Sequence, residues 1–375
     1  MVDRSILLSA IQAADAVAPA TSTKPIVTNL LIRAVATTRE VEIVATDLNV
    51  GLRCIVPGAD VRTAGEVVIG ARQITAILKE STSPSVTVRL VRSGEQHLVE
   101  VALADGDYQI QAMVGEAFPE VQRFPEQATG ITVPGARLQD MLRTTTFAMD
   151  KDKGSPVLSG LLAQVTEGEF ILAATDGKVL AEAVDRSERY QPSEALRPMV
   201  IPAPTVSHLA RILGGEVPAK VTLAPLGKVL FARLDQADGL RIELTSRLIE
   251  GAFPTYRPAI APTPGAATAT FATADLASAV RRTALMTNAT ARGIIMSLER
   301  GRAVFSNLNY SNGSARIPLA CTYAGGPMRQ GFSSQYVIDV LRAFTKPEIE
   351  IEFGRGMIMR QPGSTFLVMP ITLPS

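Results

Sequence analysis

The hydrophobic pattern of this chain predicts helices that are apolar on one side only. Ile74, Ile77 and Leu78 are spaced i, i+3 and i+4, which places them on a single helical face. The other positions of such a segment are mostly polar, so the opposite face should meet solvent or a polar partner. The segments with this stripe, in which we expect helices, are 3–16, 69–80, 136–153, 204–213, 274–292 and 333–346.

Between these segments, apolar and polar residues alternate with a period of two. Val99, Val101 and Leu103 have this pattern, and Ile349 and Ile351 repeat it near the C-terminus. Alternation of this kind is typical of strands that bury one face. Helices that pack one side on such strands indicate an α+β fold.

These elements recur at a nearly constant interval. The helix openings at Val68, Val200 and Gly331 are almost evenly spaced along the chain. The motif Thr46-Asp47-Leu48 recurs as Thr175-Asp176-Gly177 after nearly the same interval, and each follows a predicted strand. Such shared spacing indicates three copies of one unit, each with two helices and several strands. We expect three domains separated by Pro-rich linkers, with the ranges 1–127, 128–256 and 257–375.

Composition limits the classes of protein that fit. The chain has 375 residues with 37 basic and 36 acidic side chains, so a nucleic-acid partner would have to be held by segregated charge. The six helical segments hold a modest excess of basic over acidic residues, which is the sign expected for such a partner. No run is apolar enough for a membrane helix, no signal peptide is indicated, and Cys54 and Cys321 alone cannot form a disulfide framework. We therefore expect a cytoplasmic protein with no membrane partner.

Short stretches spread over the whole chain resemble one protein family. They are Lys24-Pro25-Ile26, Asn29-Leu30-Leu31, Ala45-Thr46-Asp47-Leu48, Leu158-Ser159-Gly160, 174–181, 253–257, 336–341 and 368–373. In order and spacing they resemble the bacterial DNA polymerase III β subunit, the sliding clamp family. The resemblance implies the DNA clamp fold, in which three similar domains each pack two helices on antiparallel sheets. Two such chains would close head to tail into a six-domain ring around double-stranded DNA.

The resemblance also implies a processivity factor with no catalytic site and no cofactor. The ring would tether the replicative polymerase to the duplex. The implied partners are double-stranded DNA, a second copy of the chain, the DNA polymerase III catalytic subunit, the clamp loader and other proteins with a clamp-binding motif.

Basic residues on the helices are the candidate DNA contacts, because phosphate contacts hold a duplex without reading its sequence. By the resemblance, Lys24, Arg72 and Lys151 fall where the family contacts DNA. Helix placement adds the weaker candidates Arg137, Arg143, Arg211, Arg281, Arg282, Arg292 and Arg342. An equally simple interpretation is that these residues form ordinary solvated helix faces.

A hydrophobic cleft for short peptide motifs is implied between the second and third domains. Apolar anchors would enter it while backbone hydrogen bonds hold the extended peptide. The matching positions are Leu158, Thr175, Gly177, Val179, Leu180, Pro254, Ala259, Val368, Met369, Pro370 and Ile371. Core packing is the simpler interpretation of Leu158, Leu180 and Val368 taken singly. The uncharged tail 366–373 should either dock or fray.

Three positions of this cleft depart from the family pattern. Val179, Pro258 and Thr372 stand where the family commonly has arginine or another cationic or polar residue. The rim should therefore be less cationic, and a partner motif should depend more on apolar anchors. These departures leave open a clamp paralogue with altered partner or inhibitor binding.

The resemblance places the contact that closes the ring between the first and third domains. Tyr108 and Ile110, on an edge-like strand, match one side of it, and Leu285 and Met286 match the other. Leu285 and Met286 could equally continue the apolar stripe of their helix.

Motifs for other chemistry are missing from the sequence. There is no P-loop and no nucleophile elbow, and His97 and His208 are not spaced like metal ligands. Asp47 and Asp176 could be paired catalytic carboxylates, but side chains that hold a turn are the simpler interpretation. An enzyme built on a β-rich scaffold, such as a hydrolase, is the less favoured alternative.

Overall fold

The computed structural model describes the chain except for Glu116, Lys153, Glu216 and the ranges 192–196, 288–291, 309–312 and 374–375. It forms two compact units. The first is built mainly from Met1–Gln139 and Ile201–Glu250, and the second mainly from Asp140–Pro192 and Gly251–Ser375.

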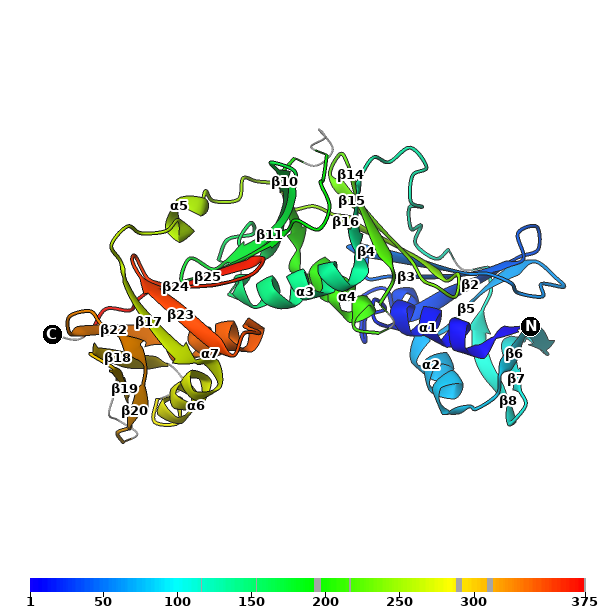
Figure 1. Ribbon diagram of the computed structural model, residues 1–375. Coiled ribbons are helices and arrows are strands. Elements are labelled where there is room, and N and C mark those ends of the chain that lie inside the picture. Colours follow the sequence, from blue (N-terminus) through cyan, green and yellow to red (C-terminus); the bar gives the residue numbers. More distant parts are fainter. Residues whose placement is uncertain are drawn as a thin grey trace. The chain divides into compact units, whose positions relative to one another are not determined.

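The first unit contains, within the described residues, a 12-stranded sheet (Figure 1). In spatial order its strands are β1 (Val2–Asp3), β6 (Ser85–Ser93), β7 (Gln96–Leu103), β8 (Gly106–Met113), β5 (Gly65–Gly70), β2 (Asn29–Val35), β3 (Glu40–Thr46), β4 (Val50–Val56), β16 (Arg241–Arg247), β15 (Val229–Asp235), β14 (Lys220–Leu226) and β9 (Ile131–Pro134). Its helices are α1 (Arg4–Asp15), α2 (Ala71–Glu80) and α4 (Ala203–Leu213), with a short 3-10 turn at Pro25–Thr28.

The second unit contains, in the part of the chain that is described, a nine-stranded and a four-stranded sheet. The larger has the order β13 (Met199–Pro202), β10 (Gly160–Thr166), β11 (Glu169–Thr175), β12 (Val179–Asp185), β25 (Ser364–Val368), β24 (Met357–Gln361), β23 (Glu348–Phe353), β17 (Ala267–Ala272) and β21 (Thr322–Tyr323). The smaller has the order β20 (Arg316–Ala320), β19 (Arg302–Asn307), β18 (Gly293–Glu299) and β22 (Met328–Ser333). The helices α5 (Arg257–Ile260), α6 (Thr273–Ala284) and α7 (Ser334–Ala343) belong to this unit, and α3 (Gly135–Thr145) has residues in both.

The order of elements along the chain repeats three times. Each copy runs strand, helix, three strands, strand, helix, three strands, beginning at β1, β9 and β17, and the third copy adds the short strand β21. In each copy the opening strand pairs antiparallel with the strand that follows the second helix, as β1 with β6, β9 with β14 and β17 with β23. The threefold repeat and the α+β fold predicted from the spacing are confirmed.

Each helix buries the apolar stripe that the sequence predicts. In α2 the buried residues are Ala71, Ile74 and Leu78, while Arg72 and Lys79 are exposed. The opposite helix faces are thus free to carry charge. Strands of the core, such as β12, are buried on both faces and have no alternation at all.

The repeated Thr-Asp dipeptides close equivalent turns. Thr46 Oγ1 donates to the Val50 carbonyl at 2.8 Å, and Asp47 Oδ1 accepts the Val50 N–H at 2.6 Å. Thr175-Asp176 makes the same two contacts with Val179, at 2.7 and 2.8 Å. Both carboxylates therefore satisfy turn backbone, as the simpler interpretation predicted.

The helices predicted over 136–153 and 274–292 end much earlier than expected, and the one predicted over 333–346 ends at Ala343. The segment 136–153 is helical only to Thr145, followed by a 3-10 turn at Thr146–Ala148; the Asp150 carboxylate then accepts the N–H groups of Asp152 and Gly154, which fixes a turn. Lys153, the last residue of that prediction, lies outside the described residues.

The segment 274–292 stops at Ala284, where the last bonds tighten to the i→i+3 pattern. Its residues 288–291 lie outside the described part of the chain. Within the predicted Pro-rich linker, Arg257–Ile260 forms the short helix α5, with Ile260 buried.

Both cysteines are free thiols. Burial raises the pKa of the Cys54 thiol, whose Sγ donates to the Ala10 carbonyl at 3.4 Å. In the described part of the chain, no helix has both the length and the apolar character to cross a membrane.

Candidate functional site

The C-terminal tail docks on the second unit. β25 pairs with β12 from Val179–Val368 to Ala183–Ser364. Beyond the strand, the Met369 N–H donates to the Lys178 carbonyl at 2.8 Å and the Ile371 N–H to the Gly331 carbonyl at 2.9 Å. The tail is therefore docked as far as Ile371, and the side chain of Met369 is left 36% exposed on this surface.

The residues predicted for a peptide cleft divide into two groups. Val179, Leu180 and Val368 lie in the paired strands and are at most 4% exposed, and Thr175 is also buried. Their side chains are buried in this structure, which is the core packing that the simpler interpretation of Leu180 and Val368 describes. At least partly exposed are Leu158, Gly177, Pro254, Ala259, Met369, Pro370 and Ile371.

A buried apolar cluster supports the partly exposed group. It consists of Leu162, Ala173, Leu180, Tyr256, Ile260, Ile358 and Leu367, with Phe253 and Ala259 packed against it. The rings of Phe253 and Tyr256 meet edge to face at 6.1 Å. The segment that carries Pro254 is thereby held against the sheet that carries the tail.

The hydroxyls of the buried Tyr256 and the half-buried Tyr336 position this region. Tyr256 donates to Glu182 at 2.6 Å, and Tyr336 of α7 donates to Asp176 of the Thr-Asp turn at 2.6 Å. Burial, followed by the bond to the carboxylate, raises the pKa of both phenols. Both therefore remain hydrogen-bond donors at neutral pH, and they tie the Pro254 segment to β12 and the Thr-Asp turn to α7.

The predicted DNA-contact residues lie mainly on exposed positions. Lys24, Arg72 and Lys151 are exposed and form no ion pair with any described residue. Arg281 and Arg282 lie on α6 opposite its buried stripe. The exposed candidates are these five together with Arg143, Arg211, Arg292 and Arg342, whereas Arg137 is half-buried.

Four of these residues have local partners. Arg143 pairs with Asp140 at 2.7 Å and Arg342 with Asp339 at 3.4 Å, which lowers their contribution to the surface charge. Arg211 donates to the Ala16 carbonyl, and Arg292 donates to Gln335. The least compensated cations are therefore Lys24, Arg72, Lys151, Arg281 and Arg282.

The candidate ring-contact residues differ in exposure. Leu285 is 75% exposed and lies just beyond α6, so it does not continue the buried stripe of that helix. Tyr108 of β8 is 41% exposed, whereas Ile110 is 5% exposed and packs inside its own unit. Met286 is half-buried. Leu285 and Tyr108 are therefore the two available apolar side chains of this set.

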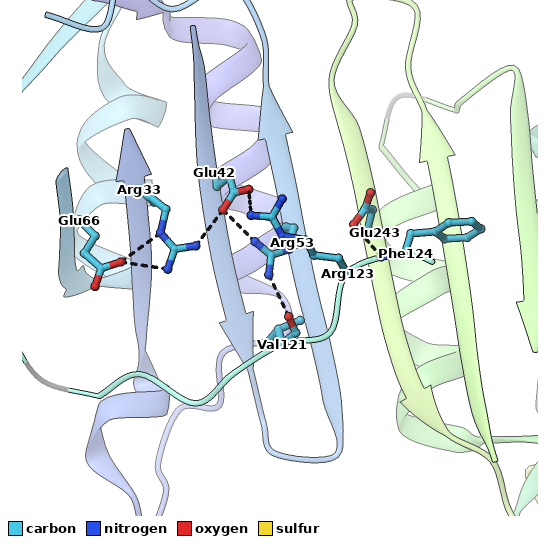
Figure 2. Close-up of polar contacts among 8 residues, drawn as sticks. All are labelled: Arg33, Glu42, Arg53, Glu66, Val121, Arg123, Phe124 and Glu243. Atoms are coloured by element: carbon cyan, nitrogen blue, oxygen red, sulfur yellow. Dashed lines mark hydrogen bonds and ion pairs between the residues drawn. The ribbon is translucent and has the colours of Figure 1, made fainter. Parts of the chain in front are cut away.

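Sequence reasoning missed a ladder of charges on the first unit. Figure 2 shows Glu66, Arg33, Glu42, Arg53 and Glu243 in a row across the adjacent strands β5, β2, β3, β4 and β16. Their signs alternate. The order follows from strand register, in which Arg33 faces both Glu66 and Glu42, and Arg53 faces Glu243.

Glu42 is the centre of this ladder and is only 4% exposed. Its carboxylate accepts one bond from each of three guanidinium groups, Arg33 at 3.1 Å, Arg53 at 2.8 Å and Arg123 at 2.8 Å. Arg53 also donates to the Val121 carbonyl at 2.8 Å. The connector that carries Val121 and Arg123 is therefore pinned to the sheet. The signal in the sequence was a charged residue in the interior of each of three mainly apolar strands.

Among the residues that the structure describes, no three His, Cys, Asp or Glu side chains are grouped as a metal site would require.

Comparison with known structures defines the class of fold. A crystal structure of the DNA polymerase III β subunit of Pseudomonas aeruginosa superimposes with a TM-score of 0.86 at 24% identity, over 99% of both chains. The sliding clamp of Bacillus subtilis gives 0.86 at 20% identity, over 100% of this chain and 98% of that one. The fold is the DNA clamp fold.

Sequence comparison gives the family. The N-terminal, central and C-terminal domains of the DNA polymerase III beta subunit match residues 1–122, 132–255 and 259–371. The chain belongs to this family. Proteins named beta sliding clamp include one from Pseudomonas aeruginosa, 27% identical over 99% of both chains. Another, from Chlamydia muridarum, is 25% identical over 100% of this chain and 98% of its own length.

Proposed function

We propose that this protein is a DNA sliding clamp, a non-catalytic processivity factor. Two chains would join head to tail into a ring around double-stranded DNA and tether the replicative polymerase to it in the cytoplasm. The observation that carries this proposal is the way consecutive repeats join, together with the unused edges at the two ends of the chain. The domain ranges 1–127, 128–256 and 257–375 are part of the same proposal.

Two junctions inside the chain use the same pair of strands. β4 of the first repeat pairs with β16 of the second, and β12 of the second pairs with β25 of the third. By repeat position, the next junction would pair β20 of the third repeat with β8 of another chain's first repeat. Among the described strands, β20 lies at a sheet edge, and the residues Gly106–Gln111 of β8 pair only with β7.

A repeated junction of this kind favours closure between identical chains. The contact is heterologous, because β20 of one chain meets β8 of the other. A twofold axis would form this contact twice and so close the ring. Tyr108 on β8 and Leu285 beside the third-repeat sheet are exposed apolar residues that such a contact would bury. Exposed cations on the helices would then contact the phosphates of the duplex, and these contacts do not depend on the base sequence.

Retention on DNA should depend on ring closure rather than on affinity. Loaded by a clamp loader onto nicked circular DNA in moderate salt, the protein should stay bound, and it should be released when the circle is cut once. Gel filtration of labelled protein with each DNA form measures this. Equal retention on circular and linear DNA would contradict encirclement, because charge contacts alone do not distinguish the two forms.

The docked tail and its neighbours are the proposed site for partner motifs. Met369 is partly exposed beside Pro370 and Ile371, and it follows shortly after Leu367, a member of the apolar cluster on which Phe253 and Ala259 pack. Methionine is flexible and accommodates different ligands. Thr372 and Pro258 are both exposed and uncharged, which favours partner motifs with apolar anchors. The polymerase catalytic subunit, the clamp loader and other motif-bearing proteins are the proposed partners.

Met369→Ala should weaken the binding of a fluorescein-labelled clamp-binding peptide by about tenfold, since an apolar anchor contact contributes ~1–2 kcal/mol. Fluorescence anisotropy measures the dissociation constant. Val217→Ala is a matched control, because Val217 is 37% exposed and lies outside all proposed sites. Identical affinities for wild type and Met369→Ala would rule out this surface.

A further inference from the structure

The first unit contains a hollow that none of the surfaces above uses. Its volume is about 330 Å³, which is within the range of ligand pockets. It lies where the connector after β8 crosses strands β2, β3 and β4 (Figure 2). The lining residues are Leu31, Arg33, Val44, Arg53, Phe118, Pro119, Glu120, Val121 and Arg123.

This hollow occupies the same repeat position as the apolar cluster under the proposed peptide site. Leu31 of β2 and Val44 of β3 correspond to Leu162 of β10 and Ala173 of β11 in the second repeat. Phe118 and Val121 of the connector correspond to Phe253 and Tyr256, with the same spacing within each pair. In both clusters the first member of the connector pair is partly buried and the second is buried. The chain thus builds the same kind of apolar floor twice.

The polar side chain at this floor differs in charge between the two copies. Arg53 is the fourth residue of β4, and the fourth residue of β12 is Glu182, which is engaged by Tyr256 and Arg257. The Arg53 side chain is 7% exposed, and its buried Nε makes no hydrogen bond with any described residue. The first copy therefore has an incompletely satisfied cation where the second has a satisfied anion.

Further cations lie at the mouth of the hollow. Arg123 is 66% exposed and uses one N–H for Glu42, and Arg33 is 36% exposed. Three arginines and one glutamate, Glu120, line the hollow, and Glu42 beside them accepts one bond from each arginine, so the cation that still faces solvent is chiefly Arg123. Guanidinium groups recognise carboxylates through paired N–H donors. The lining is therefore complementary to an apolar anchor that carries an adjacent carboxylate.

We propose that this hollow is a second peptide-binding site, which takes an extended segment of a partner protein with a leucine-like anchor and an acidic side chain. The anchor packs on the partly exposed Phe118 and Pro119, over the buried floor of Leu31 and Val44, and the carboxylate pairs with Arg123. The inference rests in part on the proposed peptide site of the second unit. It goes beyond that site, because the two copies would select partner segments of different charge.

The test uses an acetylated eight-residue peptide of alternating leucine and aspartate, with an alternating leucine and asparagine peptide for comparison. The methyl NMR signals of Leu31, Val44 and Val121 report binding in the intact protein. The aspartate peptide should shift these signals, and Arg123→Gln should weaken its binding at least fivefold. Arg62→Gln, which removes an 84% exposed arginine elsewhere, should leave its binding unchanged. The asparagine peptide should bind weakly and equally to all three proteins.

Absence of shifts at the three methyl groups, or equal affinity for wild type and Arg123→Gln, would overturn the proposal. In a separate sample, the clamp-binding peptide should shift the methyl signal of Leu158 and report the site on the second unit. Met369→Ala should weaken that binding about tenfold and leave the shifts that the aspartate peptide causes at Leu31 and Val44 unchanged. Failure of either site is therefore read separately from the other.

Discussion

Leu285→Asp should leave the protein monomeric and unable to remain on circular DNA. Leu285 is 75% exposed, and the proposed ring would bury it against β8 of the next chain. Loss of one buried leucine costs ~1.5–3 kcal/mol, and a twofold ring contains the contact twice. The dimer dissociation constant should therefore rise at least about 100-fold. Sedimentation equilibrium measures the mass, and the nicked-circle assay measures retention.

The control is Leu226→Asp, which introduces the same charge at a leucine that is 56% exposed and outside the proposed contact. It should remain dimeric and stay on the circle. A Leu285→Asp protein that is still a dimer, or a Leu226→Asp protein that is a monomer, would show that the contact lies elsewhere.

Glu42→Gln should lower the free energy of unfolding of the first unit by ~3–5 kcal/mol, because breaking a buried ion pair by removing one partner is costly. The substitution keeps the shape of the side chain but removes the charge that three arginines share. Arg53 would then remain buried without the carboxylate that it hydrogen-bonds, beside two other guanidinium groups. Urea unfolding followed by circular dichroism measures the change.

Glu66→Gln is the matched control for this loss. Glu66 also pairs with Arg33, at 2.9 Å, but its side chain is 57% exposed, so the expected change is at most ~1 kcal/mol. Equal destabilisation by both substitutions would contradict a central role for Glu42 in the charge ladder.

The fold was predictable where local sequence decides it. The apolar stripe of α2 and the Thr-Asp turns depend on residues that are near neighbours in the chain. Their regular recurrence along the chain predicted the threefold repeat. The ends of α3 and α6 were not predictable, because they are set by carboxylate and backbone bonds such as those of Asp150. Apolar periodicity carries no information on such bonds.

The candidate site was predicted only in part, for a different reason. Val179 and Val368 are buried in β12 and β25, two interior strands of the nine-stranded sheet. A strand without alternation gives no indication of which side chain reaches a surface. Leu285, in contrast, lies just past the end of a helix, where the stripe no longer applies.

The charge ladder could not be predicted from spacing at all. Arg33, Glu42 and Arg53 come together through strand register, and Arg123 joins them from the distant connector after β8. Charged residues in apolar strands signal that a partner exists, but only the register identifies it.

The two strand junctions inside the chain and the one proposed between chains differ in how they depend on protein concentration. β4 with β16 and β12 with β25 are held by continuous polypeptide, so their formation does not depend on how dilute the protein is. A β20–β8 contact between separate chains follows mass action, and its occupancy falls as concentration falls. A protein that opens the ring would therefore separate the two chains at that contact. A duplex could then enter the ring without the unfolding of either chain.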